Sequence, residues 1–191
     1  MQRLGLFGGA FNPVHLGHLL VAGAALEELQ LDKVFFIPAA RSPFKQNNDT
    51  APAELRVRWL RLALAGRTNF EIDEQEIGRG GVSYSIETAR QYANRFPHAT
   101  LFWLIGADNA PTLDGWRNAD ELAKLVEFAA VPRPGQAPPQ FPKPFRGRAL
   151  KGFPLEISSR EIRARIKARL PVEYLLPPFV AADIHDAAAY R

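Results

Sequence analysis

The sequence has no cysteine. This absence excludes a disulfide framework, a thiolate zinc site and a cysteine nucleophile, and it fits a reducing cytoplasm. The sequence also lacks an apolar run long enough to span a bilayer. Its start, MQRLGLFGG, reaches two glycines before any long apolar stretch, which is unlike a signal peptide. We therefore expect a cytoplasmic protein with no membrane contact.

Two common nucleotide-binding signatures are missing as well. There is no GKS or GKT phosphate loop, and no G-x-G-x-x-G pattern follows the first expected strand. Each of these patterns places backbone N–H groups against phosphates in a known structural context. Their absence argues against a standard P-loop enzyme and against a dinucleotide-binding dehydrogenase.

The remaining composition is ordinary for a globular protein. Of the 191 residues, 47% are hydrophobic and 23% are charged, so we expect a single domain over residues 1–191 with one core. The formal net charge is +4. A mild positive excess suits phosphate-bearing ligands, nucleic acid or simple solubility, so the positions of the cations must decide between them.

Apolar runs and helical periodicities alternate along the first 132 residues. The expected strands are residues 3–7, 33–38, 70–73, 100–106 and 127–132, and the expected helices are residues 18–29, 54–65, 85–96 and 118–125. This alternation predicts an α/β fold with a mostly parallel sheet, in which ligands lie beyond the carboxyl ends of the strands. The glycines after Phe7 and Ile105 should lie at that rim, whereas Trp59 and Trp103 belong to the core.

The composition changes between Pro132 and Lys151, where six prolines rule out a regular helix. We expect residues 132–151 to form an extended loop of the same domain, because too little chain follows to fold alone. A strand at 155–157, a basic amphipathic helix at 159–170 and a short helix beyond Pro177 would follow as a C-terminal helical part.

The segment GGAFNPVHLGH, residues 8–18, carries the clearest chemical signal. Its glycines let a backbone approach phosphates, and Pro13 stiffens the loop. His15 and His18 stand at the mouth of a helix, where imidazoles can donate hydrogen bonds to phosphate oxygens. The alternatives are a glycine turn with an incidental capping histidine, and a metal pair, which no nearby carboxylate or third histidine completes. Two of four histidines in one glycine-rich loop favour the phosphate site.

This segment resembles the GG-x-F-D-P-x-H-x-G-H signature of the HxGH nucleotidyltransferase superfamily, with Asn12 in place of the usual Asp. Residues 157–163, ISSREIR, resemble a second signature of that superfamily, although Ser158 and Glu161 are also spaced as a capping box. The resemblance implies a Rossmann-like, doubly wound α/β fold with helices on both faces. It implies catalytic roles for His15, His18 and Arg163 and no metal ligand from the protein. The ATP-binding residues that it implies are Gly8, Gly9, Phe11, His15, His18, Gly106, Asp108, Ser158, Ser159 and Arg163.

Four further segments resemble the bacterial nicotinate mononucleotide adenylyltransferase branch of the superfamily. They are FIPAARSPFK at 36–45, GVSYSIETAR at 81–90, GADNAPTLDGW at 106–116 and AVPRPG at 130–135. The substrate-binding residues that this resemblance implies are Lys45, Ser85, Trp116, Arg117 and Arg133. Ser85 would lie near the pyridine nucleotide, and backbone amides around Trp116 and Arg117 would receive the nicotinate carboxylate.

Several of these side chains have a second interpretation. Asp108 follows a central strand, where a carboxylate can hold ribose hydroxyls or simply cap a helix. Trp116 offers a flat face for a pyridine ring, or it is a half-buried core residue. Lys45 and Arg133 either pair with phosphate or are solvent-exposed cations.

The implied reaction is attack by the phosphate of nicotinate mononucleotide on the α-phosphorus of ATP, with Mg²⁺ accompanying ATP. The acceptor alternatives are nicotinamide mononucleotide and phosphopantetheine, the latter disfavoured by the SYS and GADN…W segments. A different class is a nucleotide- or RNA-binding module that uses the basic helix at 159–170, but we expect no nucleic-acid partner because no aromatic and basic single-strand platform is evident. A homo-oligomer is compatible with the sequence.

Overall fold

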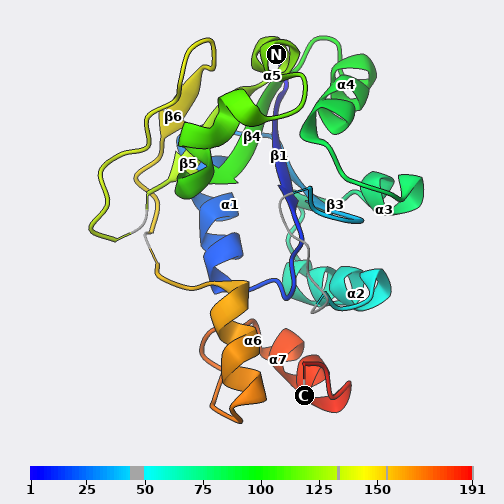
Figure 1. Ribbon diagram of the computed structural model, residues 1–191. Coiled ribbons are helices and arrows are strands. Elements are labelled where there is room, and N and C mark those ends of the chain that lie inside the picture. Colours follow the sequence, from blue (N-terminus) through cyan, green and yellow to red (C-terminus); the bar gives the residue numbers. More distant parts are fainter. Residues whose placement is uncertain (44–49, 133, 154, 191) are drawn as a thin grey trace.

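The computed structural model describes residues 1–43, 50–132, 134–153 and 155–190. Its strands form one sheet in the order β3-β2-β1-β4-β5-β6, and every neighbouring pair is parallel. The strands are β1 (Arg3–Gly9), β2 (Lys33–Pro38), β3 (Phe70–Ile72), β4 (Thr100–Gly106), β5 (Glu127–Val131) and β6 (Gly147–Ala149). The expected parallel α/β sheet is confirmed (Figure 1).

Helices cover both faces of this sheet. They are α1 (Leu16–Glu28), α2 (Ala53–Leu64), α3 (Gln75–Arg79), α4 (Ser85–Arg95), α5 (Ala119–Leu125), α6 (Ser159–Lys167) and α7 (Pro178–Asp186), with a 3₁₀ helix η1 (Ala107–Gly115) after β4. One hydrophobic cluster includes side chains of α1, α2, α6 and α7, and the other includes side chains of α4, α5 and η1. None of the described helices is long and apolar enough to cross a membrane.

The central strands are apolar on both sides because each side meets a different cluster. In β2, Val34 and Phe36 belong to the cluster on the α1 side, whereas Phe35 and Ile37 belong to the cluster on the α4 side. A parallel strand buried on both faces reads as a continuous apolar run, which is why these strands were recognisable. Trp59 and Trp103, both expected in the core, are 0% and 3% exposed.

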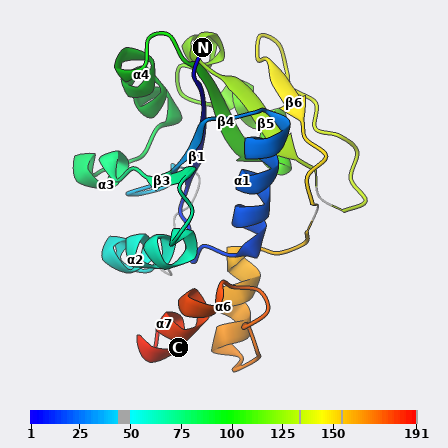
Figure 2. The same ribbon diagram turned by 180° about the vertical axis from the view of Figure 1, so that it is seen from behind.

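The strand order reverses between β1 and β4, and this reversal places the site. In open α/β sheets the crevice for a ligand lies at such a switch point, outside the carboxyl ends of the strands. Gly9 ends β1 and Gly106 ends β4, so the glycines stand at that edge as expected. Both ribbon views show α6 and α7 beyond the same edge (Figures 1 and 2).

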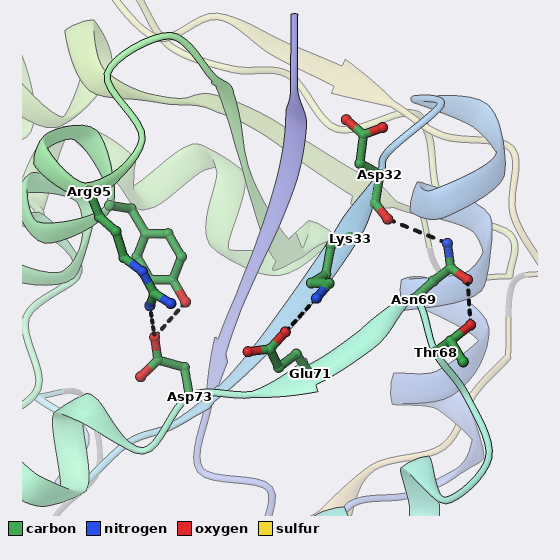
Figure 3. A network of polar contacts seen from close by, with 8 residues as sticks. Asp32, Lys33, Thr68, Asn69, Glu71, Asp73 and Arg95 are labelled. Atoms are coloured by element: carbon green, nitrogen blue, oxygen red, sulfur yellow. Dashed lines mark hydrogen bonds and ion pairs between the residues drawn. The ribbon is translucent and has the colours of Figure 1, made fainter.

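The edge strand β3 is held to its neighbours by polar contacts (Figure 3). Lys33 on β2 forms an ion pair of 2.6 Å with Glu71 on β3, and Asn69 donates to the Asp32 carbonyl over 3.3 Å. At the far end of β3, Asp73 accepts a hydrogen bond of 2.6 Å from the Tyr92 hydroxyl of α4. These contacts fix a strand that is too short to be held by its own ladder.

Two short elements differ from the sequence-based expectation. Residues 155–157 form no strand, so that prediction was wrong. The sheet is instead completed by β6, which lies inside the segment expected to be a loop throughout, and Arg148 on β6 pairs with Glu127 on β5 over 2.5 Å. Helix α3 was not expected; it buries Glu76, which accepts a hydrogen bond of 2.5 Å from Thr88.

The C-terminal part is fastened to α2 by one buried carboxylate. Asp183 on α7 is 8% exposed, accepts a hydrogen bond of 3.0 Å from the Trp59 indole and pairs with Arg58. Val180 and Ile184, one turn apart on the same helix, enter the cluster that α1 and α2 share. The docking of α7 therefore combines apolar burial with a satisfied buried polar group.

Replacing Asp183 with Ala should lower the free energy of unfolding by about 1–3 kcal/mol, because the Trp59 indole would lose its acceptor in a buried position. Urea unfolding followed by circular dichroism measures this change. Asp186→Ala is the matched control, since the Asp186 side chain is 82% exposed and sits on the same helix. Equal stabilities of the two variants would contradict this account of the docking.

Candidate active site

A cavity of about 1020 Å³ opens at the carboxyl edge of β1 and β4. Gly8, Gly9 and Gly106 line it, as the sequence led us to expect. Its charged lining consists of Arg41, Arg56, Arg160 and Arg163. No acidic side chain is found in the described part of the lining, so the cavity is electrostatically suited to an anionic ligand.

The two histidines of the glycine-rich loop lie side by side in this cavity. Their ring centroids are 3.7 Å apart, and the Phe11 ring packs against His18 at 5.0 Å. Gly17 makes this arrangement possible, because a Cβ there would come within 3.0 Å of His15 Nδ1. The glycine between the two histidines of the motif thus leaves room for the His15 ring.

Hydrogen bonding defines the state of the His18 ring. His18 Nδ1 accepts a hydrogen bond of 3.2 Å from the His15 backbone N–H at the start of α1. A ring nitrogen that accepts carries no proton, so the neutral His18 ring holds its hydrogen on Nε2. Nε2 is therefore a hydrogen-bond donor, as the phosphate-binding hypothesis requires.

His15 is almost fully buried, with 6% of its surface exposed. Burial lowers the pKa of His15 to about 4, so its ring is neutral near pH 7. Its Nδ1 atom is buried and has no hydrogen-bond partner among the residues that the structure describes. An unsatisfied buried polar atom is costly, which is typical of a position completed by a ligand.

Helix α6 brings the second sequence signature to the same cavity. Ser158 caps the helix, since its hydroxyl accepts a hydrogen bond of 3.2 Å from the Glu161 N–H. Ser159 donates to the Pro13 carbonyl over 2.9 Å, and Arg163 Nη1 donates to the Asn12 carbonyl over 2.8 Å. The N-terminus of α6, with its partial positive charge, is thereby fixed against the histidine loop.

Arg56 is a site residue that the sequence analysis did not identify. Arg56 is 2% exposed, and its guanidinium donates to the carbonyls of Ala10 and Ala39 over 2.8 Å and to that of Ala51 over 3.1 Å. Burial lowers the pKa of Arg56. The signal was present: residue 56 lies three, four and seven positions before the buried Trp59, Leu60 and Ala63.

Four further predicted residues are not among those that line this cavity. Asp108 is exposed on η1, and Ser85 begins α4. Trp116 lines a separate pocket of about 470 Å³, and the Arg117 guanidinium lies 4.4 Å from the ring of Tyr84, which does line the main cavity. The roles assigned to these four residues stay predictions. Lys45 and Arg133 lie outside the described residues.

The chain matches known proteins over most of its length. The family model described as Cytidylyltransferase-like matches residues 6–165. A nicotinate-nucleotide adenylyltransferase of Bacillus subtilis is 37% identical over 191 residues, which cover 100% of both chains. A probable nicotinate-nucleotide adenylyltransferase of Methylacidiphilum infernorum is 39% identical over 98% of this chain and 92% of its own. The chain belongs to the nicotinate-nucleotide adenylyltransferase family.

Solved structures of this family share the fold. The nicotinic acid mononucleotide adenylyltransferase of Plasmodium falciparum, complexed with NaAD, superposes with a TM-score of 0.81 over 100% of this chain and 98% of its own, at 12% sequence identity. Such low identity speaks for the architecture alone. The Rossmann-like fold expected from the sequence is confirmed by this likeness together with the strand order.

The buried neutral state of His15 predicts a pH-dependent stability. An unfolded histidine with its ordinary pKa of 6.5 takes up a proton as the pH falls, whereas the folded ring does so only near pH 4. The stability that depends on neutral His15 is thus complete above pH 6.5 and is lost progressively as the pH falls from 6.5 to about 4. Between about pH 7 and about pH 5, wild type should lose about 2 kcal/mol more stability than His15→Asn.

Urea unfolding at several pH values measures this difference. His98→Asn is the control, because His98 is exposed and its removal should leave the pH dependence of wild type unchanged. Parallel curves for wild type and His15→Asn would show that burial does not hold the folded ring neutral.

Proposed function

We propose that the chain transfers AMP from ATP to nicotinate mononucleotide in the biosynthesis of NAD. An oxygen of the mononucleotide's 5′-phosphate forms a bond to the α-phosphorus of ATP. The bond from that phosphorus to the oxygen bridging to the β-phosphate breaks, and the products are deamido-NAD and pyrophosphate. One observation supports this proposal above all. The two histidines, the N-terminus of α6 and Arg163 line the same cavity, and its described lining contains no acidic side chain.

No side chain needs to act as nucleophile, since the attacking phosphate oxygen is already an anion. The side chains act by positioning the phosphates and by stabilising the charge that develops on them. His18 offers a fixed donor at Nε2, and Arg163 carries a permanent charge on a guanidinium that Asn12 orients. His15, neutral because of its burial, adds a second imidazole without adding charge.

Mg²⁺ is proposed to enter with ATP. Among the described residues no group of three His, Cys, Asp or Glu side chains could hold a metal ion. Mg²⁺ is commonly bound through substrate phosphates and water rather than by an all-protein cage, so this lining fits a metal carried by the nucleotide. When bound, the ion would neutralise charge on the triphosphate.

We propose that the pyridine end of the acceptor binds near Tyr84. Tyr84 lines the cavity, and Arg117 stacks on its ring and forms an ion pair of 3.8 Å with Glu87 of α4. This packing joins the Ser85 segment to the Trp116 segment, the two segments that resemble the acceptor site of the family. We propose that the nicotinate group binds where they meet, and that the reaction takes place in the cytoplasm.

Replacing His18 with Ala should keep the fold and lower kcat ~10²–10³-fold, the usual cost of losing one well-placed donor to a developing charge. Pyrophosphate release with ATP, Mg²⁺ and nicotinate mononucleotide measures the loss. His98→Ala, at an exposed histidine, serves as control and should retain full turnover. A wild-type kcat in the His18→Ala variant would contradict the proposed mechanism.

The identity of the acceptor is tested with the same assay. Nicotinate mononucleotide should be used at a higher kcat/KM than nicotinamide mononucleotide, because backbone amides can pair with a carboxylate but meet only a neutral group in the amide. Phosphopantetheine should give no pyrophosphate. Turnover with another acceptor alone would preserve the histidine chemistry and refute the acceptor proposed here.

A further inference from the structure

Asn12 connects the far C-terminal part of the chain to the proposed catalytic arginine. It is 4% exposed, and its side-chain oxygen accepts two hydrogen bonds, of 3.0 Å from the Ala51 N–H and of 2.5 Å from the Tyr190 hydroxyl. Its backbone carbonyl accepts the hydrogen bond of 2.8 Å from Arg163 Nη1. The carbonyl that accepts from Arg163 thus belongs to a residue whose side chain is hydrogen-bonded to Tyr190.

Tyr190 is held firmly in this position. Its ring packs against Trp59 with centroids 5.7 Å apart, next to the Trp59–Asp183 hydrogen bond that docks α7. Its φ angle of 66° lies in the left-handed region, which a bulky residue adopts at a cost and keeps only when its contacts compensate. These contacts hold the Tyr190 hydroxyl within hydrogen-bond distance of the Asn12 side-chain oxygen.

The hydroxyl of Tyr190 is protonated and acts as a hydrogen-bond donor. Burial raises the pKa of Tyr190, while the nearby charges of Arg163 and Arg56 act in the opposite direction without cancelling it. The Ala51 N–H can only donate, so the oxygen end of the Asn12 amide must face it, and the Tyr190 hydroxyl donates to the same oxygen. Two donors on one oxygen leave the amide a single orientation.

We infer that Tyr190 is a positioning residue for adenylyl transfer: its hydroxyl fixes Asn12, and Asn12 fixes the guanidinium of Arg163 against the triphosphate. The inference rests on the proposed function and deepens it, because it adds a residue that does not line the cavity. Tyr190 touches no reacting atom. It acts on Arg163 through Asn12.

The kinetic test compares Tyr190→Phe with Tyr174→Phe, the same change at a tyrosine that is 90% exposed. Tyr190→Phe should lower kcat about three- to tenfold, the effect of one buried hydrogen bond, and should change the KM for ATP less than twofold. Tyr174→Phe should match wild type. A kcat for Tyr190→Phe equal to that of Tyr174→Phe would overturn the inference.

A double-mutant cycle separates positioning from general loosening. If Tyr190 acts through Arg163, adding Tyr190→Phe to Arg163→Ala should lower kcat by less than twofold further. A full three- to tenfold loss in the Arg163→Ala background would instead indicate a structural role.

A readout without turnover keeps this inference distinct from the proposed function. Arg163 Nε is buried and has no hydrogen-bond partner among the described residues, so its N–H should give a resolved NMR signal that disappears in Arg163→Lys. That signal should shift in Tyr190→Phe and stay in place in Tyr174→Phe. Wild-type protein without adenylyl transfer would refute the proposed function, whereas an unmoved signal would refute the positioning role of Tyr190.

Discussion

The loop from Ala10 to Pro13 has no helix or strand hydrogen bonds of its own, and buried carbonyl groups must find donors. Its donors come from distant parts of the chain. Arg56, 46 positions along, bonds the Ala10 carbonyl; Arg163, 151 positions along, bonds that of Asn12; and Ser159, 146 positions along, bonds that of Pro13. The shape of the site therefore depends on α2 and α6 being docked before the loop can present its histidines.

In the proposed function the site binds phosphates without a glycine-rich dinucleotide fingerprint. In the usual arrangement the first turn and the helix that follows it supply the N–H groups for phosphate. Here the helix after β1 begins with two imidazoles, and the donor-rich helix end is that of α6, brought in from the C-terminal part. In the proposed function, cationic side chains and the N-terminus of α6 bind the phosphates that the first turn and its helix bind in the usual arrangement.

The elements recognisable from sequence were those whose local pattern and tertiary environment agree. Strands β2 and β4 begin and end at the predicted residues, because continuous burial makes each a bounded apolar run. The strand predicted at 155–157 failed, since an edge strand of three residues has no pattern of its own and β6 took that place by pairing with β5. The local sequence does not show which edge of the sheet is available to a further strand.

The same division applies to the site. His15, His18 and Arg163 were predicted because motif and chemistry coincide in contiguous segments, and the structure brings them to one cavity. Tyr190 could not be predicted, since its partner is 178 positions away and a tyrosine near a short helix looks like any surface aromatic. Arg56 was missed for another reason. A charged side chain on a helix is expected to face solvent unless its hydrogen-bond acceptors are known, and the acceptors of Arg56 are carbonyls in three separate loops.

Asn12 shows what this chain's departure from the common Asp does to the electrostatics. Like a carboxylate oxygen, the side-chain oxygen of Asn12 accepts hydrogen bonds from the Ala51 N–H and the Tyr190 hydroxyl, but the amide carries no charge. A carboxylate next to this network would offset part of the positive charge of Arg56 and Arg163, both of which line the cavity. The amide preserves the hydrogen-bond geometry and leaves that charge uncompensated within the described lining, so more of it remains available to the phosphates of the substrates.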